Sequence, residues 1–285
     1  MNHRNILTAA VLAASLGVAH ASIFNPVGPQ IREANNNWSL AFINQTINYK
    51  EVPPIPLLPN PQPNPLDTET GSVRGIHWDV RHQHAYLGWG LGINYLQSKG
   101  FGGNVTYNGY FVQNNDTLTP ASGPTEIGQI SGHLFVRGGF SPVTHMALFF
   151  GPIVGGHMWA RNNASWAGGT WEDYSFLYAG GDASLQYAIG PVVFGVSGVV
   201  GRTFVSSMNT GNITYHLGNS PFQRIGGRVT YNATKHLSVY VDYSRTTYSF
   251  GVSPVVTSGV TQSVEPTSHT TLSAVELGVR IHNFF

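Results

Sequence analysis

The sequence predicts an all-β fold, a closed antiparallel transmembrane β-barrel of about ten strands, and three observations support this. Long stretches alternate apolar and polar residues with the two-residue period of a β-strand. Charged residues make up only 9% of the chain, and there are 34 Gly, whereas soluble proteins average about 25% charged residues. After residue 21, no apolar run is long enough for a membrane-spanning helix. A membrane-spanning strand needs only about ten residues.

The N-terminus has the pattern of an export signal. A short basic segment, residues 1–5, precedes an apolar stretch, and Ala19-His20-Ala21 has the form of a cleavage site. We therefore expect residues 1–21 to be a cleaved signal peptide. Residues 22–37 are expected to be a polar, irregular periplasmic lead-in, and residues 38–285 the barrel domain.

Ten stretches of the chain alternate in this way, and the connections between them are short and long in turn. The stretches are about 38–50, 72–82, 85–97, 125–139, 145–160, 172–188, 191–206, 221–232, 236–250 and 269–285. The short connections are near residues 82–84, 141–144, 189–191 and 232–235, and the long loops are 51–71, 98–124, 161–171, 207–220 and 251–268. Membrane barrels have short periplasmic turns and long extracellular loops, so we expect loops 51–71 and 98–124 outside the cell. A soluble β-sandwich is disfavoured because its strands average five or six residues.

Lipid contact requires the apolar face of each strand to point outward, so the polar face is expected to line the lumen. Most of the charged residues fall on this inner face: His77, Asp79, Arg81, Arg137, Asp182, Arg224, Arg228, Asp242, Glu276 and Arg280. So narrow a barrel is expected to be filled by paired charges, because an unpaired buried charge is costly. We expect Arg280 to pair with Glu276 or with a carboxylate on a neighbouring strand. Candidates for the aromatic girdles at the membrane surfaces are Trp38, Tyr49, Trp159, Trp171, Tyr231 and Tyr243, and a packing role is the alternative for each of them.

The last stretch ends with an apolar face made of Leu277, Val279, Ile281 and Phe285, although Asn283 interrupts the series. A final strand ending in Phe resembles the assembly signal that is read by the folding machinery of bacterial outer membranes. We therefore expect the cell outer membrane as the location, and the barrel-assembly machinery as a partner.

Several segments resemble the opacity-type small outer-membrane β-barrel proteins of Gram-negative bacteria. They are Tyr49-Lys50-Glu51 and the stretches 69–75 (ETGSVRG), 151–161 (GPIVGGHMWAR) and 265–270 (EPTSHT). This resemblance implies the fold, the location and surface-exposed loops, but no shared catalytic set. Ten strands also resemble the omptins, which are outer-membrane proteases. His77 and Asp79 resemble half of an omptin site, but no His lies two residues from Asp242. The spacing of Ser131 and His133 departs from the lipid A deacylase pattern.

The sequence therefore predicts a non-enzymatic surface barrel that acts through its loops in adhesion or envelope integrity. A narrow porin-like channel and a barrel enzyme, either an omptin-type protease or a lipid A modifying enzyme, are the alternatives. No cofactor or metal is expected, since His82 and His84 lie at a turn without a third ligand nearby in the sequence. Expected partners are outer-membrane lipid, lipopolysaccharide and an extracellular partner of loops 51–71 and 98–124. The 14 basic and 13 acidic residues do not indicate a nucleic-acid partner.

Overall fold

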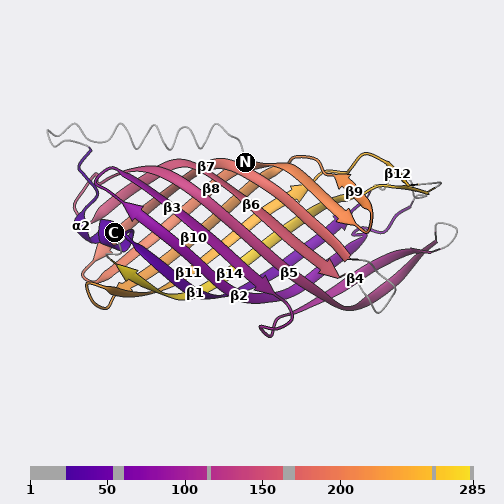
Figure 1. Ribbon diagram of the computed structural model, residues 1–285, viewed down its shortest axis with the longest axis horizontal. Helices are drawn as coiled ribbons and strands as arrows, with labels where there is room; N and C mark the ends of the chain where they lie inside the picture. Colours follow the sequence, from indigo (N-terminus) through magenta and orange to yellow (C-terminus); the bar gives the residue numbers. More distant parts are fainter. Residues whose placement is uncertain (1–23, 54–60, 114–116, 163–170, 259–260, 283–285) are drawn as a thin grey trace.

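A computed structural model describes residues 24–53, 61–113, 117–162, 171–258 and 261–282. Ten long antiparallel strands close into one barrel (Figure 1). In order around the barrel these are β1 (Asn37–Val52), β2 (Asp67–Gln83), β3 (Leu87–Gln97), β5 (Thr117–Phe140), β6 (Met146–Asn162), β7 (Trp171–Ile189), β8 (Val192–Thr210), β10 (Pro221–Asn232), β11 (Leu237–Phe250) and β14 (Thr267–His282). The barrel is closed because β1 pairs with both β2 and β14.

The two ends of the barrel differ, as the alternating connections predicted. The four short turns lie at one end, called here the short-turn end, together with the end of β14 (Figure 1). The opposite, long-loop end carries four shorter strands: β4 (Asn104–Gln113), β9 (Ile213–His216), β12 (Val256–Ser258) and β13 (Thr261–Ser263). Strand β4 pairs with β2 and with the first part of β5, so that these strands continue the sheet beyond the barrel.

The ten predicted strands are confirmed, but several are longer than the alternation indicated. Strand β2 begins at Asp67 rather than near residue 72, β5 begins at Thr117 rather than near 125, and β8 ends at Thr210. Backbone N–H and C=O groups need partners, and neighbouring segments at the long-loop end supply them by continuing the strand ladders. Much of what the sequence predicted as loop is therefore paired β-structure.

The outer face carries the predicted apolar belt. Leu87, Trp89 and Ile93 on β3 are 57%, 39% and 42% exposed, and similar residues continue around the barrel. The terminal strand contributes Leu277, Val279 and Ile281 to this face, whereas Phe285 lies outside the described residues. Burying so large an apolar surface in lipid is the favourable arrangement for such a belt.

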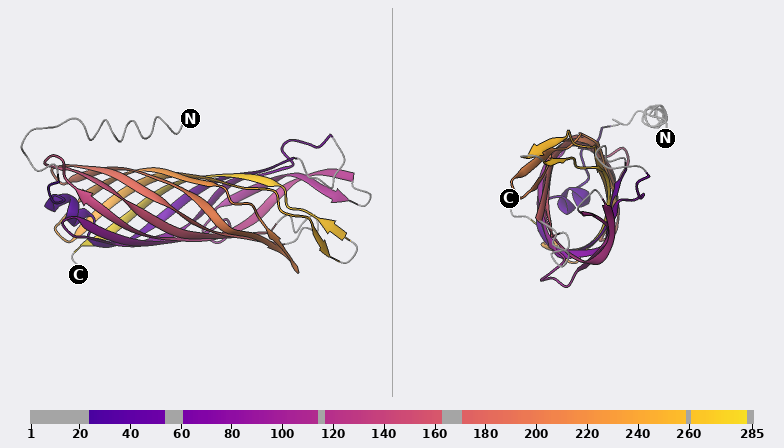
Figure 2. Two further views of the ribbon diagram at one scale, coloured as in Figure 1. Left: turned by 90° about the horizontal axis from the view of Figure 1, so that it is seen from above. Right: turned by 90° about the vertical axis from the view of Figure 1, so that its right-hand side faces the viewer.

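The segment before β1 differs from the predicted irregular lead-in. Residues Pro29–Ala34 form a short helix, α2, which begins with a proline at its first turn. Viewed along the barrel axis, α2 lies inside the barrel outline at the short-turn end (Figure 2). Ile31 and Ala34 are buried against a cluster that includes Phe149, Ala188 and Val193 of the barrel wall. None of the helices in the described residues is long and apolar enough to cross a membrane.

Candidate functional site

The inward-facing residues of β7 show how the lumen is organised from one end to the other. Glu172 lies at the long-loop end and is followed by Tyr174, Phe176 and Tyr178, then by Asp182 and Ser184, then by Gln186 and Ala188. These positions alternate with outward ones, as the two-residue period of a strand requires. They mark four layers: a charged rim cluster, an aromatic layer, an inner charged network, and the contacts to α2.

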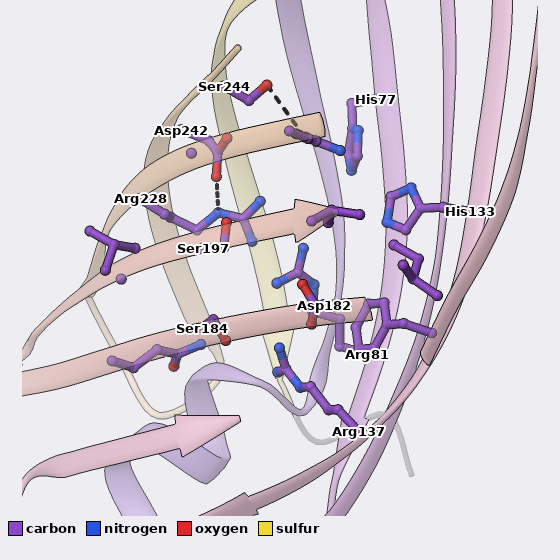
Figure 3. Close-up of a pocket in the computed structure, with 18 residues that line it drawn as sticks. His77, Arg81, His133, Arg137, Asp182, Ser184, Ser197, Arg228, Asp242 and Ser244 are labelled. Carbon is purple, nitrogen blue, oxygen red and sulfur yellow. Dashed lines mark hydrogen bonds and ion pairs between the residues drawn. The ribbon is translucent and has the colours of Figure 1, made fainter. Parts of the chain in front are cut away.

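The inner network contains the ten residues that the sequence placed in the lumen. Asp79 on β2 is its centre, since it accepts hydrogen bonds from Ser39 and Arg81 and lies 3.9 Å from His77 Nε2. On the opposite wall, Arg228 Nε donates to Asp242 Oδ2 at 2.6 Å (Figure 3). In the described residues, these contacts pair two arginines of the inner network, Arg81 and Arg228, with carboxylates.

Other members of the inner network hold α2 in place. Arg137 Nη2 donates to Asn35 Oδ1 at 2.7 Å, and its guanidinium lies 4.3 Å from the ring centre of Phe149. Arg280 Nη1 donates to Ala34 O at 3.2 Å, and its guanidinium lies 4.4 Å from the ring centre of Tyr240. The network therefore ties α2 to the wall of the barrel.

The expected pairing of Arg280 with a carboxylate was wrong. In the described residues, Arg280 makes no ion pair, and Glu276 instead lies 3.7 Å from His77 Nδ1. Glu276 and Arg280 are four residues apart on one strand, which separates them by two repeats along the lumen. Arg280 reaches the backbone of the segment before β1, which the sequence predicts to be an irregular periplasmic lead-in.

The residues that resembled half of an omptin site lie within the inner network. His77 and Asp79 are 2% and 1% exposed, and both are covered by the layers above and below. Asp242 pairs with Arg228, and it lines the same cavity as His77. His133 is also inside the lumen, where Gly92 on β3 leaves room for its ring.

Aromatic side chains fill the lumen above the inner network. Tyr178 and Phe222 stack with ring centres 4.0 Å apart, and Phe176 lies 4.7 Å from Tyr248. The remaining members of this aromatic layer are Tyr49, Trp159, Tyr174 and Phe250. Tyr49 and Trp159 were predicted as girdle residues at the membrane surface, but they are 0% and 2% exposed, which corrects that prediction. Their inward register, opposite the outward Lys50 and Met158, is the reason.

A rim cluster, formed by Arg161 and five carboxylates, closes the lumen at the long-loop end. Arg161 Nε donates to Glu172 at 2.5 Å, and Nη2 donates to Glu51 at 2.8 Å. Asp67 and Glu69 lie 3.8 and 3.6 Å from Nη1. The fifth carboxylate, Glu265, accepts a hydrogen bond from Tyr174 at 2.6 Å. Arg161 also lies over the rings of Tyr49 and Tyr174, at 4.8 and 5.2 Å.

The rim cluster lies beyond the apolar belt, because the outward neighbours Asn48, Lys50 and Thr70 are polar. Burial raises the pKa of Glu69 to about 7, although Arg161 acts in the opposite direction. Burial also raises the pKa values of Asp67 and Glu265. One guanidinium cannot neutralise five buried carboxylates, so part of the cluster keeps its protons near neutral pH.

The sequence does not predict the rim cluster, because Glu51, Asp67, Glu69 and Arg161 fall in the expected loops 51–71 and 161–171. A signal was present: Tyr49 and Glu51, and Asp67 and Glu69, continue the two-residue period after the apolar side chains on the outer face end. The pattern indicates a strand that has left the membrane but still has an inner face. Among the described residues, no group of three or more His, Cys, Asp or Glu has the arrangement of a metal site.

Neither protein-family models nor curated protein sequences give a match to this chain. The crystal structure of the outer-membrane protease OmpT from Escherichia coli is similar, with a TM-score of 0.53 at 9% identity, covering 87% of this chain and 97% of OmpT. Neisserial surface protein A aligns with a TM-score of 0.35 at 10% identity, covering 86% and 97% of the two chains. The attachment invasion locus protein Ail of Yersinia pestis aligns with a TM-score of 0.31 at 9% identity, covering 87% and 99%. At this identity, the likeness to OmpT concerns the fold alone. The chain is by its fold an outer-membrane β-barrel.

Proposed function

We propose that this protein is a closed barrel of the outer membrane that acts at the cell surface through the strands and loops of its long-loop end. The observation that carries the proposal is the filled lumen. From the short-turn end to the long-loop end, α2, the inner network, the aromatic layer and the rim cluster follow one another along the barrel. A passage for solutes would require at least the aromatic layer to move.

The extensions at the long-loop end supply the surface for a partner. Strands β4 and β5 pair over residues Val105–Gln113 and Thr117–Thr125, beyond the point where β3 ends at Gln97. Polar residues that include Asn108 and Thr68 face outward here. Such a polar hairpin presents exposed backbone edges and side chains for adhesion or for contacts within the envelope.

Lipid is the second class of partner in this proposal. Arg245 is the first outward residue of β11 after Tyr243, and Arg74 has the same place on β2 after Ile76. Both therefore follow the apolar belt on the long-loop side, where lipopolysaccharide phosphates would lie in the proposed orientation. Guanidinium groups bind phosphate well because they offer paired donors. The terminal strand with Leu277 and Val279 is proposed as the segment that the barrel-assembly machinery binds.

Conductance in planar bilayers tests the closed lumen. We expect no steady openings from the purified protein, and regular single-channel steps would instead support the narrow channel. The surface role needs a second measurement. A variant in which a two-residue turn replaces residues 101–124 should still insert into the membrane, because the pairing of β3 with β5 is retained. Its folded and heat-unfolded forms should still migrate differently in gel electrophoresis. We expect the full protein to give cells adherence or detergent resistance, and the variant to give neither. Unchanged adherence and detergent resistance would contradict a role for this hairpin.

A further inference from the structure

A cavity of about 100 Å³ lies inside the inner network, between α2 and the aromatic layer. Four arginines line it: Arg81, Arg137, Arg224 and Arg228. Figure 3 shows that Arg81, Arg137 and Arg228 come from different walls of the barrel and point toward a common space. A volume of this size is enough for a small ion with a few water molecules, since each water occupies about 30 Å³ in the liquid.

Several hydrogen-bond donors around the cavity are buried without an acceptor among the described residues. In the described part of the chain, Arg137 Nε and Arg228 Nη1 are buried and have no hydrogen-bond acceptor. The buried hydroxyl of Ser184, which also lines the cavity, has no partner there either. Leaving a buried charged donor without an acceptor costs more than leaving a neutral one. These donors therefore indicate that an acceptor occupies the cavity.

The balance of positive and negative side chains around the cavity also indicates an anion. Arg280 joins the four arginines that line the cavity, so the inner network holds five arginines. It holds four carboxylates: Asp79, which binds Arg81, Asp242, which binds Arg228, Glu276, which lies beside His77, and Asp182. Asp182 is influenced by Arg137, Arg81 and Arg224 together, but forms no ion pair with any of them in the described structure. One positive charge is left without a counter-charge in a narrow lumen, where such a charge is costly.

We infer that the cavity is a binding site for one small monovalent anion of the halide class, held by Arg137, Arg224 and Arg228. An anion of one negative charge balances the excess cation and accepts the unused N–H and O–H donors at once. Water would satisfy the donors but would leave the charge uncompensated. This site is independent of the surface role proposed above, because it would bind its ion in a barrel that neither conducts nor adheres.

The test is to refold the full-length mature protein into detergent micelles in sodium chloride, bromide or gluconate at equal ionic strength. We expect the unfolding midpoint to rise saturably with chloride or bromide but not with gluconate, which is too large for the cavity. Crystals grown in bromide should show an anomalous peak between Arg137 and Arg228. Equal midpoints in the three salts, or no such peak, would overturn the inference and leave water as the occupant.

Substitutions at the cavity test whether the rise of the unfolding midpoint with halide comes from binding there. Arg224→Gln keeps the contacts to α2, which involve Arg137, and should weaken halide binding by about tenfold or more. Arg137→Met should weaken it similarly, although this change also removes the bond to Asn35. Arg202→Met is the matched control, because Arg202 is exposed on the outer face of β8 and should leave the halide effect unchanged. If Arg224→Gln retains the full halide effect, the site is not the one inferred here.

Discussion

Arg161 is the residue on which the long-loop end of the lumen depends. Its side chain is 2% exposed, and it has four carboxylates within 4.0 Å and two tyrosine rings beside it. Removal of one partner from a buried ion pair leaves the other charge without compensation, at a cost of about 3–5 kcal/mol. We therefore expect Arg161→Met to lower the free energy of unfolding by about that amount at pH 7, measured by urea titration in micelles.

The matched control for Arg161 is an ion pair of the same chemistry that is open to solvent. Lys99 and Glu126 lie 2.7 Å apart, but their side chains are 77% and 46% exposed. Exposed pairs of this kind contribute about 0–1 kcal/mol, so Lys99→Met should hardly change the unfolding midpoint. A loss for Arg161→Met no larger than that for Lys99→Met would show that water reaches the rim cluster.

Glu69 makes stability depend on pH. Its pKa is about 7 in the folded protein, compared with an ordinary value of 4.5, so the folded state binds more protons than the unfolded state between these values. Stability from this group is therefore present at low pH and is lost as the pH rises through about 7, by about 3 kcal/mol in total. We expect Glu69→Gln to reduce the fall in unfolding free energy between pH 5 and pH 8. An identical pH profile in the variant would show that Glu69 does not retain its proton.

At the residue scale, the alternation of side chains was sufficient to place Asp79, Arg137 and Arg228 in the lumen. It could not identify their partners, because these depend on which strands face each other across the barrel. Arg280 is the instructive case: its acceptor, Ala34 O, is 246 residues away and belongs to a segment with no strand pattern. Tyr49 was placed on the wrong face because aromatic residues near strand ends occur on both faces, and only the register separates them.

Among the elements, α2 is the one whose position changes the interpretation of the lumen. Asn35, directly after the helix, accepts from Arg137 and donates to Gln186 Oε1 at 2.8 Å. It therefore links the helix to β5 and β7. We expect Asn35→Ala to lower the free energy of unfolding by about 1.5–3 kcal/mol, because a buried guanidinium loses its acceptor.

Limited proteolysis gives an additional measurement of this link, since Arg32 in α2 provides a trypsin site. Cleavage there should become faster in Asn35→Ala as the helix leaves the lumen more often. Asn48→Ala, at an exposed outward position on β1, is the control and should change neither quantity. Equal cleavage rates in the two variants would show that Asn35 does not hold the helix.

At the element scale, the sequence predicted the ten strands because each is a long run of alternating residues, and even β3 has 11 residues. It did not predict α2, which is only six residues long and has two buried apolar residues, Ile31 and Ala34. So short a helix shows no helical pattern in the sequence and would not be stable alone in water. It forms because residues in the lumen pack against it. The additional strand β4 was hidden in the same way, within a segment rich in Gly and Asn.

For the whole molecule, the orientation in the membrane is the assumption on which a surface role depends. Asn108 on β4 and Lys235 in the turn between β10 and β11 are both exposed, at opposite ends of the barrel. The chain has no native Cys, so single cysteines can be introduced at these positions. We expect Asn108→Cys to react with a membrane-impermeant maleimide on intact cells, and Lys235→Cys to react only after lysis. The reverse pattern would place the long-loop end in the periplasm.

Strand β5 gives the long-loop end a fixed geometry. It runs without interruption for 24 residues, from Thr117 to Phe140, which at about 3.4 Å per residue is a contour of about 80 Å. Its outer part, paired with β4, is thus a β-hairpin that continues the barrel wall, and it is not a flexible loop. The distance of a binding surface on this hairpin from the membrane is set by the number of residues in its strands. This distance changes only by whole residues. Two inserted residues in each strand of the hairpin move the binding surface farther from the membrane and leave every side chain on its original face. One inserted residue moves the side chains of the binding surface to the opposite face. Among homologous barrels with such a hairpin, the number of residues in each of its two strands should therefore differ by even numbers.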